Sequence, residues 1–196
     1  ALLRQGRPAR DFSDNPDDLQ ALARLQLITS KPVLYVCNVD EETAATGNEF
    51  SVQMAEQAEK EGAGCVVISA AIEAEVAQLG NETERVEYLA SLGLEETGLT
   101  RVIRAGYTLL GLITFFTAGP KEARAWTVRQ GTLAPGAAGV IHSDFERGFI
   151  RAETIPYADY ISCGGEQGAR DAGKMRQEGK GYVMADGDVI MFRFNV

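Results

Sequence analysis

The chain has 196 residues, of which 45% are apolar, and its formal net charge at pH 7 is -9. This length suits one large or two small domains, and no apolar run approaches membrane-spanning length, so we expect a soluble globular protein without a membrane partner. Residues 1–110 hold nine Lys and Arg against eighteen Asp and Glu, whereas residues 111–196 hold ten of each; because acidic surfaces repel phosphates, any RNA contact is expected in the second part.

The amino-terminal residues predict a helical end and then a new helix. The chain opens with Ala-Leu-Leu-Arg-Gln in what reads as mid-helix and without Met, which we interpret as a piece of a longer polypeptide. A helix is expected from Pro16, because Asn15 is a favourable N-cap and Asp17 complements the positive helix end.

Residues 33–37 form a continuous apolar run, which predicts a strand buried on both faces of a parallel sheet. Asn38 and Glu41 follow it, at the carboxyl end of the strand, where ligands bind in open α/β sheets. The spacing Asn-x-x-Glu is close to the Asn-Lys-x-Asp with which guanine-nucleotide-binding proteins read their base. The alternative is a turn, because Asn and Asp are ordinary turn residues after a strand.

A second strand with a similar ending follows after one helix. Residues 47–61 predict that helix, with Phe50, Met54 and Ala58 on its inner face. Residues 64–68 predict the second strand, which ends in Ser69-Ala70. The result is a right-handed βαβ unit, and its order of strand, Asn-x-x-Glu, helix, strand and Ser-Ala is how nucleotide-binding G domains end.

Three helices are expected next, over residues 72–79, 82–92 and 99–110. In the last of them, Leu99 and Ile103 fall on one helical face with Gly106, so we predict that this face is buried and that Gly106 permits close approach of another backbone.

From residue 112 the periodicity changes to that of strands. A hairpin is expected over residues 112–128, a helix through Val140 and a strand over 148–155. A Gly-rich segment with a helical piece follows, and then two strands, 182–184 and 189–194, joined by a tight turn at Asp186-Gly187. This order predicts a small α+β module of β-grasp type.

Several single residues invite a functional reading but have a simpler one. His142, the only histidine, is expected on the surface or in packing rather than in catalysis, and Trp126 in hairpin packing rather than base stacking. The three cysteines lack the pairing that a zinc site needs, so we expect reduced thiols in a cytoplasmic protein. Six cations in the second part are candidate RNA-phosphate contacts, with a solvated loop as the alternative: Lys121, Arg124, Arg129, Lys174, Arg176 and Lys180.

The chain resembles the C-terminal portion of a YchF-type ATPase, a branch of the Obg-related P-loop NTPases, over nearly its whole length. The segments that carry the resemblance are residues 38–41, 69–75, 98–107, 115–122, 124–127, 141–152, 186–189 and 192–196.

The resemblance implies an α/β fold in three parts. Residues 1–30 would be the end of a helical insertion with its return helix, residues 31–110 the C-terminal part of the nucleotide-binding G domain, and residues 111–196 a TGS domain. It also implies a cytoplasmic protein, expected as a monomer, that binds ATP and associates with the ribosome or ribosomal RNA.

The site residues implied for ATP are Asn38, Val39, Glu41, Ser69 and Ala70. Glu41 is one methylene longer than the Asp with which the Asn-Lys-x-Asp of guanine-nucleotide-binding proteins accepts from guanine, and Val39 replaces the lysine that packs on the base, so ATP is expected over GTP. No Gly-x-x-x-x-Gly-Lys-Ser/Thr occurs in the sequence, and the ligands of Mg²⁺ are expected outside this chain. We therefore expect this piece to be inactive as a hydrolase; the alternative function is an RNA- or ribosome-binding module without a nucleotide role.

Overall fold

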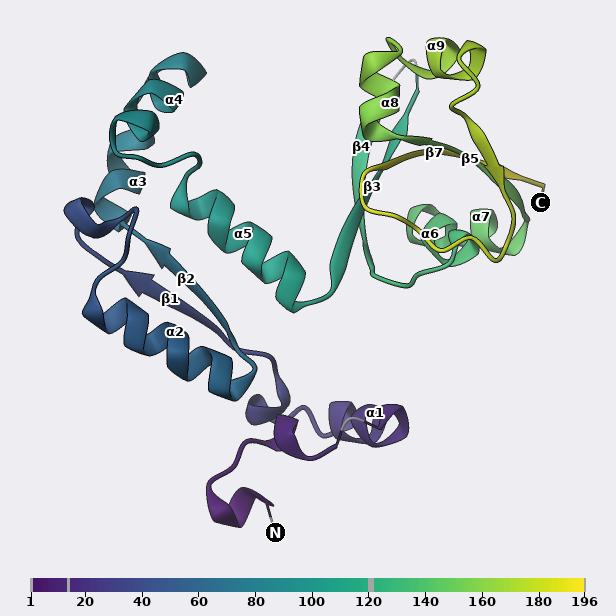
Figure 1. Cartoon of the computed structure of the whole chain (residues 1–196). Helices are drawn as coiled ribbons and strands as arrows, with labels where there is room; N and C mark the ends of the chain where they lie inside the picture. Colours follow the sequence, from purple (N-terminus) through teal and green to yellow (C-terminus); the bar gives the residue numbers. More distant parts are fainter. Residues whose placement is uncertain (1, 14, 120–121, 196) are drawn as a thin grey trace. The chain divides into compact units, whose positions relative to one another are not determined.

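The computed structural model describes residues 2–13, 15–119 and 122–195, and the chain divides into unit 1, Ala1–Leu110, and unit 2, Gly111–Val196 (Figure 1). Within these ranges no helix has both the length and the apolar character that a membrane crossing requires. In chain order, unit 1 contains η1 (Leu2–Gln5), η2 (Ala9–Asp11), α1 (Pro16–Arg24), η3 (Ile28–Ser30), β1 (Leu34–Asn38), η4 (Glu41–Thr43), α2 (Glu49–Glu61), β2 (Gly64–Ile68), α3 (Ala70–Val76), α4 (Glu82–Ser91) and α5 (Gly98–Leu109).

Helix α1 begins at Pro16, as predicted, because the Asn15 side chain accepts a hydrogen bond from the Asp17 backbone N–H at 2.9 Å. No residue of α1 is buried. Its apolar stripe instead lines an open hollow of about 870 Å³, together with side chains of η1 and the residues that flank η2.

Strands β1 and β2 pair in parallel, with Asn38 opposite Ile68, and α2 and α5 contact the pair from opposite faces (Figure 1). The prediction of two parallel strands joined by a helix is confirmed. The predicted burial of the first strand on both faces is wrong: Val36, which is 45% exposed, and Asn38 project from the same face of β1, and both are exposed.

Helix α2 starts later than predicted and is rotated. Asn48 and Ser51 form a reciprocal capping box that fixes the first turn and buries Ser51. Phe50 therefore points outward and is 77% exposed, contrary to the prediction, while Ala58 is buried.

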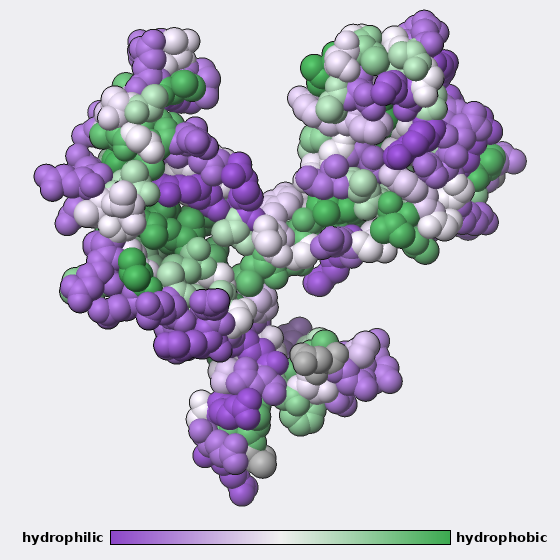
Figure 2. All heavy atoms as spheres, viewed as in Figure 1, coloured by the Kyte–Doolittle hydropathy of each residue, from purple (hydrophilic) through white to green (hydrophobic). Residues whose placement is uncertain are grey.

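Helix α5 also presents a different face from the predicted one. Leu99 and Ile103 are exposed, and Figure 2 shows apolar atoms on the surface where α5 and the strands lie. The inner face begins at Gly98, whose N–H donates to Glu73 Oε1 at 2.6 Å. A Cβ on Gly98 would lie 2.9 Å from two atoms of Ile68, whereas a Cβ on Gly106 would meet nothing within 4 Å. The predicted close approach at Gly106 is wrong, and it occurs at Gly98.

This contrast predicts opposite effects of two alanine substitutions. Gly98→Ala is expected to destabilise unit 1 by about 1–3 kcal/mol, because its methyl group overpacks against β2. Gly106→Ala is expected to stabilise it by about 0.5–1 kcal/mol through helix propensity. Denaturant unfolding followed by far-UV circular dichroism measures both changes. Trp126 is the only tryptophan and lies in unit 2, so its fluorescence reports the unfolding of that unit. An unchanged unfolding midpoint in Trp126 fluorescence would confine the effect of each substitution to unit 1. Equal effects of the two substitutions on stability would contradict this packing.

Unit 2 contains, in chain order, β3 (Leu112–Ala118), β4 (Ala123–Arg129), α6 (Ala134–Ile141), α7 (Ser143–Arg147), β5 (Phe149–Pro156), α8 (Tyr157–Ser162), α9 (Glu166–Asp171), β6 (Arg176–Glu178) and β7 (Asp188–Phe194). Its five strands form one mixed sheet in the order β4-β3-β7-β5-β6, with β3 and β7 parallel. Small residues of α6 pack against Phe115 and Phe192 to form the core on one face, and α8 and α9 lie on the other side of the sheet (Figure 1).

The last part of unit 2 differs from the prediction. Residues 182–184 are not a strand, because only Val183 makes an isolated bridge, to Leu133. The turn at Asp186-Gly187 therefore leads into β7 rather than closing a hairpin, and β7 pairs instead with β5 and β3.

Strand β6 and helix α7 were not predicted. His142 caps α7, since its Nδ1 accepts from the Asp144 N–H at 3.1 Å, which is a structural role.

Candidate functional site

The carboxyl ends of β1 and β2 meet at one corner of unit 1 and are tied together by the Asn38 side chain. Asn38 Oδ1 accepts a hydrogen bond from the Ala70 backbone N–H at 2.9 Å, and the Val39 N–H donates to the Ile68 carbonyl at 2.9 Å. The loop after β1 and the start of α3 are thus held in fixed register. We call residues 38–41 with Ser69 and Ala70 the base corner.

The hydrogen bond to Ala70 engages only the oxygen of the Asn38 carboxamide. Its oxygen is occupied within the protein, whereas its amino group makes no hydrogen bond within the described residues, and Asn38 is exposed. An exposed, oriented N–H₂ group is a donor for a ring-nitrogen acceptor of a ligand.

Ser69 adds an unpaired hydroxyl at the same corner. The residue is 2% exposed, and its Oγ has no hydrogen-bond partner in the described part of the chain. A buried hydroxyl without a partner costs about 1–3 kcal/mol. Because this oxygen is buried, a ligand in solvent does not reach it in this structure, and the assignment of Ser69 to the site stays a prediction.

Glu41 and Val39 differ in what they offer a ligand. Glu41 is exposed at the start of η4, and its carboxylate makes no hydrogen bond or ion pair with the described residues. The hydrogen bond from Tyr88 to Glu75 raises the pKa of Tyr88 to about 12, and the negative charge of Glu41 makes a smaller contribution to this rise. Val39 is buried, at 7% exposed, so its side chain supports the loop and leaves its backbone for contacts.

A small apolar cluster packs α3, which begins at Ala70 in the base corner, against α4. It joins the loop after η4 to α3 and α4 and consists of Ala44, Ile72, Val76, Leu89 and Leu94. Glu73 completes this support, because its two carboxylate oxygens accept from the first N–H groups of α5, at Gly98 and Leu99. Sequence reasoning missed the role of Glu73, for which the only sequence signal is an acidic residue four positions after the Ser that ends the strand.

The predicted RNA-contact residues of the first hairpin do not form one cluster. The Arg124 guanidinium lies 4.1 Å from the centre of the Trp126 ring, whose Nε1 donates to Thr117 Oγ1 at 2.9 Å. Arg129 is five residues further along β4 and therefore projects from the opposite face of the strand. Lys121 lies outside the described residues.

The predicted cations of the Gly-rich segment are largely engaged within the protein. Lys174 Nζ lies 3.4 Å from an Asp159 carboxylate oxygen, and Arg176 lies 3.5 Å from Glu178 and 4.0 Å from the buried Asp188. Lys180 is exposed and has no ion pair in the described ranges.

The cysteines form no disulfide in the described structure. All three are free, and the Sγ atoms of Cys37 and Cys65 lie 3.8 Å apart on neighbouring strands. Burial, and then the neighbouring Cys37 thiol, raises the pKa of Cys65, which keeps this thiol protonated at neutral pH. No group of three or more His, Cys, Asp or Glu side chains among the described residues is arranged to hold a metal ion.

Comparison with known proteins places this geometry in a family. The YchF-GTPase_C family, described as a protein of unknown function (DUF933), matches residues 112–195. The chain is 56% identical over 195 residues to the ribosome-binding ATPase YchF of Haemophilus influenzae, an alignment that covers 100% of this chain and 53% of the relative. Residues 112–195 thus match the YchF-GTPase_C family, and the chain as a whole is similar to the C-terminal portion of YchF-type ATPases. The resemblance to YchF-type ATPases read from the sequence is thereby confirmed.

Other YchF-family and Obg-like proteins match over a similar extent. The chain is 41% identical over 198 residues to Obg-like ATPase 1 of Rattus norvegicus, covering 99% of this chain and 50% of that protein. The solved structure of the Schizosaccharomyces pombe YchF GTPase superposes with a TM-score of 0.82 at 33% identity and covers 97% of this chain and 50% of that one. The chain thus spans about half the length of the YchF-family relatives that it matches.

Proposed function

We propose that this chain forms the base-recognition wall of a nucleotide-binding protein that prefers ATP to GTP and associates with the ribosome through unit 2. The observation that carries the nucleotide part is the hydrogen bond between Asn38 Oδ1 and the Ala70 N–H. It fixes a donor group at the carboxyl edge of two parallel strands, where α/β proteins bind their ligands.

The base chemistry follows from the donors and acceptors at the corner. The free Asn38 amino group can donate to purine N7, which adenine and guanine share, and so supports binding of either base. Discrimination therefore rests on Glu41. A carboxylate one bond shorter would accept from guanine N1–H and N2–H₂, and the longer Glu41 is out of register for that pair, whereas adenine presents an N6–H₂ donor instead.

The phosphate and metal chemistry is assigned to other residues of the whole protein. The sequence contains no Gly-x-x-x-x-Gly-Lys-Ser/Thr, and the base corner offers groups that fit a purine rather than a triphosphate. Bound Mg²⁺ would neutralise phosphate charge during hydrolysis. We assign residues 31–110 to the C-terminal part of a P-loop G domain and residues 1–30 to the end of its helical insertion.

We assign unit 2 to a β-grasp, TGS-type module that contacts the ribosome in the cytoplasm, with the chain acting as a monomer. Its mixed five-stranded sheet packed on α6 supports the fold assignment. The bacterial relatives are named ribosome-binding ATPases, which supports the ribosome as the partner.

A second candidate is an RNA- or ribosome-binding module without a nucleotide role of its own. The arrangement of Arg124 over the Trp126 ring favours it, because a guanidinium stacked on an aromatic ring is a platform for nucleic-acid bases. The nucleotide experiments below separate the two functions, since this alternative predicts no effect of any change at the base corner.

A hydrolysis experiment tests the division between base recognition and phosphate chemistry. We expect the 196-residue chain to hydrolyse neither ATP nor GTP, and a hybrid polypeptide, in which the amino-terminal half of the Haemophilus influenzae relative precedes this chain, to hydrolyse ATP. Phosphate release is measured after two independent purifications. Turnover by the 196-residue chain that persists at the rate of the hybrid would place a catalytic centre in this chain and contradict the proposal.

A further inference from the structure

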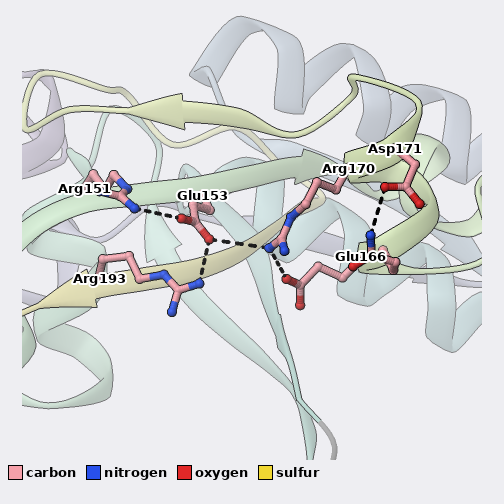
Figure 3. A network of polar contacts seen from close by, with 7 residues as sticks. Arg151, Glu153, Glu166, Arg170, Asp171 and Arg193 are labelled. Carbon is pink, nitrogen blue, oxygen red and sulfur yellow. Dashed lines mark hydrogen bonds and ion pairs between the residues drawn. The ribbon is translucent and has the colours of Figure 1, made fainter.

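Three arginines of unit 2 converge on one carboxylate, on the face of the sheet opposite to α6 (Figure 3). Arg151 and Glu153 lie two residues apart on β5 and so point to the same side. Arg193 of β7 pairs directly with Arg151 across the two strands, and Arg170 reaches the same point from α9. We call Arg151, Arg170 and Arg193 the arginine trio.

The carboxylate of Glu153 organises this trio. Its side chain is 7% exposed; Oε1 accepts from Arg151 at 3.2 Å, and Oε2 accepts from Arg193 at 2.9 Å and lies 4.0 Å from Arg170. The hydrogen bond from Arg193, followed by that from Arg151, holds the pKa of Glu153 below its usual value. The carboxylate is therefore ionised at neutral pH and offsets the repulsion between like charges placed directly opposite on neighbouring strands.

The trio keeps unused hydrogen-bonding capacity toward solvent. Each arginine side chain is 44–46% exposed, and its contacts to carboxylates are made through Nη2. Arg170 also pairs with Glu166 at 2.7 Å, so three positive charges face two negative ones. Among the described residues, the Nε and Nη1 groups of these arginines have no hydrogen-bond or ion-pair partner, so they are available as donors on side chains that the carboxylates hold in place.

The surface beside the arginine trio has no deep pocket among the described residues, which limits the kind of partner that can bind there. The hollow beside it, lined by Glu153, Tyr160 and Met191 among others, has a volume of only about 10 Å³. It cannot receive a small molecule or the apolar anchor side chain that a protein interface centres on. A partner must bind from outside through charge and hydrogen bonds, and planar guanidinium forks match phosphate groups in a bidentate manner.

We propose that the arginine trio, held in place by Glu153, is a contact site for the phosphate backbone of ribosomal RNA. This inference rests on the proposed ribosome association and gives it a location distinct from the six cations predicted from the sequence. Arg151, Arg170 and Arg193 fix the position of the module on the RNA and do not read its sequence. Glu153 acts as a positioning residue that orients the guanidinium groups.

The test compares the 196-residue chain with a triple variant, Arg151→Gln, Arg170→Gln and Arg193→Gln. Binding to purified ribosomes and to protein-free ribosomal RNA is measured across a salt series. We expect the triple variant to bind both at least about tenfold more weakly and to show a salt slope lower by about three units, one for each lost phosphate contact. A matched control removes three exposed arginines elsewhere, Arg24→Gln, Arg104→Gln and Arg147→Gln, and is expected to change affinity less than about twofold.

Two single substitutions test the same site in case the triple variant does not fold. Arg170→Gln alone removes the trio member that lies furthest from Glu153 and is expected to lower the slope by about one unit. Arg193→Lys retains the charge but not the fork, and is expected to bind with intermediate affinity. Far-UV circular dichroism and Trp126 fluorescence confirm that each variant is folded.

The outcomes separate this inference from the proposed function. If the unmodified chain binds ribosomes and the folded trio variants bind with the same affinity and slope, the trio is not a contact site, while the ribosome association stands. If the unmodified chain binds neither ribosomes nor ribosomal RNA, both proposals fail. If the trio is needed for intact ribosomes but not for protein-free RNA, the partner is an acidic ribosomal protein, and the RNA assignment is overturned.

Discussion

Replacing Asn38 by Asp in the hybrid polypeptide is expected to weaken binding of ATP and GTP alike by about 10- to 100-fold. Asp retains an oxygen that can accept from the Ala70 N–H, now 2.9 Å from Asn38 Oδ1, so the corner keeps its internal bond. It replaces the free amino donor by a second oxygen, which faces the purine N7 lone pair. Loss of that hydrogen bond and exposure of an unpaired polar group cost about 1.5–3 kcal/mol, where each 1.4 kcal/mol is tenfold in affinity.

A second asparagine provides the matched control for this change. Asn81 also accepts a backbone hydrogen bond at 2.9 Å, from Glu84 at the start of α4, but lies outside the base corner. Isothermal titration with ATP should show no loss for Asn81→Asp, and thermal unfolding should show similar midpoints for the two variants. Unchanged ATP affinity in Asn38→Asp would show that this side chain does not contact the base.

Shortening Glu41 is expected to change nucleotide preference rather than overall affinity. Glu41→Asp should raise GTP affinity relative to ATP by on the order of 100-fold, because an Asp at this position can accept from guanine N1–H and N2–H₂, and hydrogen bonds to a charged acceptor contribute about 1.5–3 kcal/mol each. The free carboxylate of Glu41 in the described structure is consistent with such a role. Competition between ATP and GTP for one fluorescent nucleotide measures the ratio directly.

Three variants accompany this substitution. Glu41→Gln keeps the length and removes the charge, and should gain no GTP binding. Glu42→Asp makes the same chemical change one residue along, at an exposed position, and should leave the ratio unchanged. Glu41→Asp with Val39→Lys should favour GTP further, and its unfolding is measured alongside because Val39 is buried. A ratio that does not move in Glu41→Asp would remove Glu41 from base discrimination.

The type and order of most elements could be predicted because they depend on local chemistry. Asn15 before Pro16 determines where α1 starts, and Gly62, in a left-handed conformation at φ 63°, determines where α2 ends. The apolar runs that became β1 and β2 are short and contain β-branched or aromatic residues, which favours strands.

The faces of the helices could not be predicted because they depend on neighbours far along the chain. Helical periodicity places Gly106 and Leu99 on one apolar face, yet α5 is rotated by the bonds from its first N–H groups to Glu73 and by the contact of Gly98 with Ile68. The sequence contains no signal for that contact, which joins residues thirty positions apart.

The base corner and the arginine trio also differ in whether the sequence could predict them. Asn38 ends β1 and Ser69 follows β2, so the topology of a parallel pair was enough to bring them to the same edge of the sheet. The arginine trio depends instead on the register of β5 with β7, on the bulge near Arg151 and on the position of α9. None of these follows from local sequence, and the sequence pointed to other cations.

Direct competition of ATP against GTP for the unmodified hybrid polypeptide tests the central claim, that the base corner of this chain selects adenine. We expect tighter binding of ATP, with a preference that Glu41→Asp reduces and Glu42→Asp does not. Equal or tighter binding of GTP by the unmodified hybrid would contradict it.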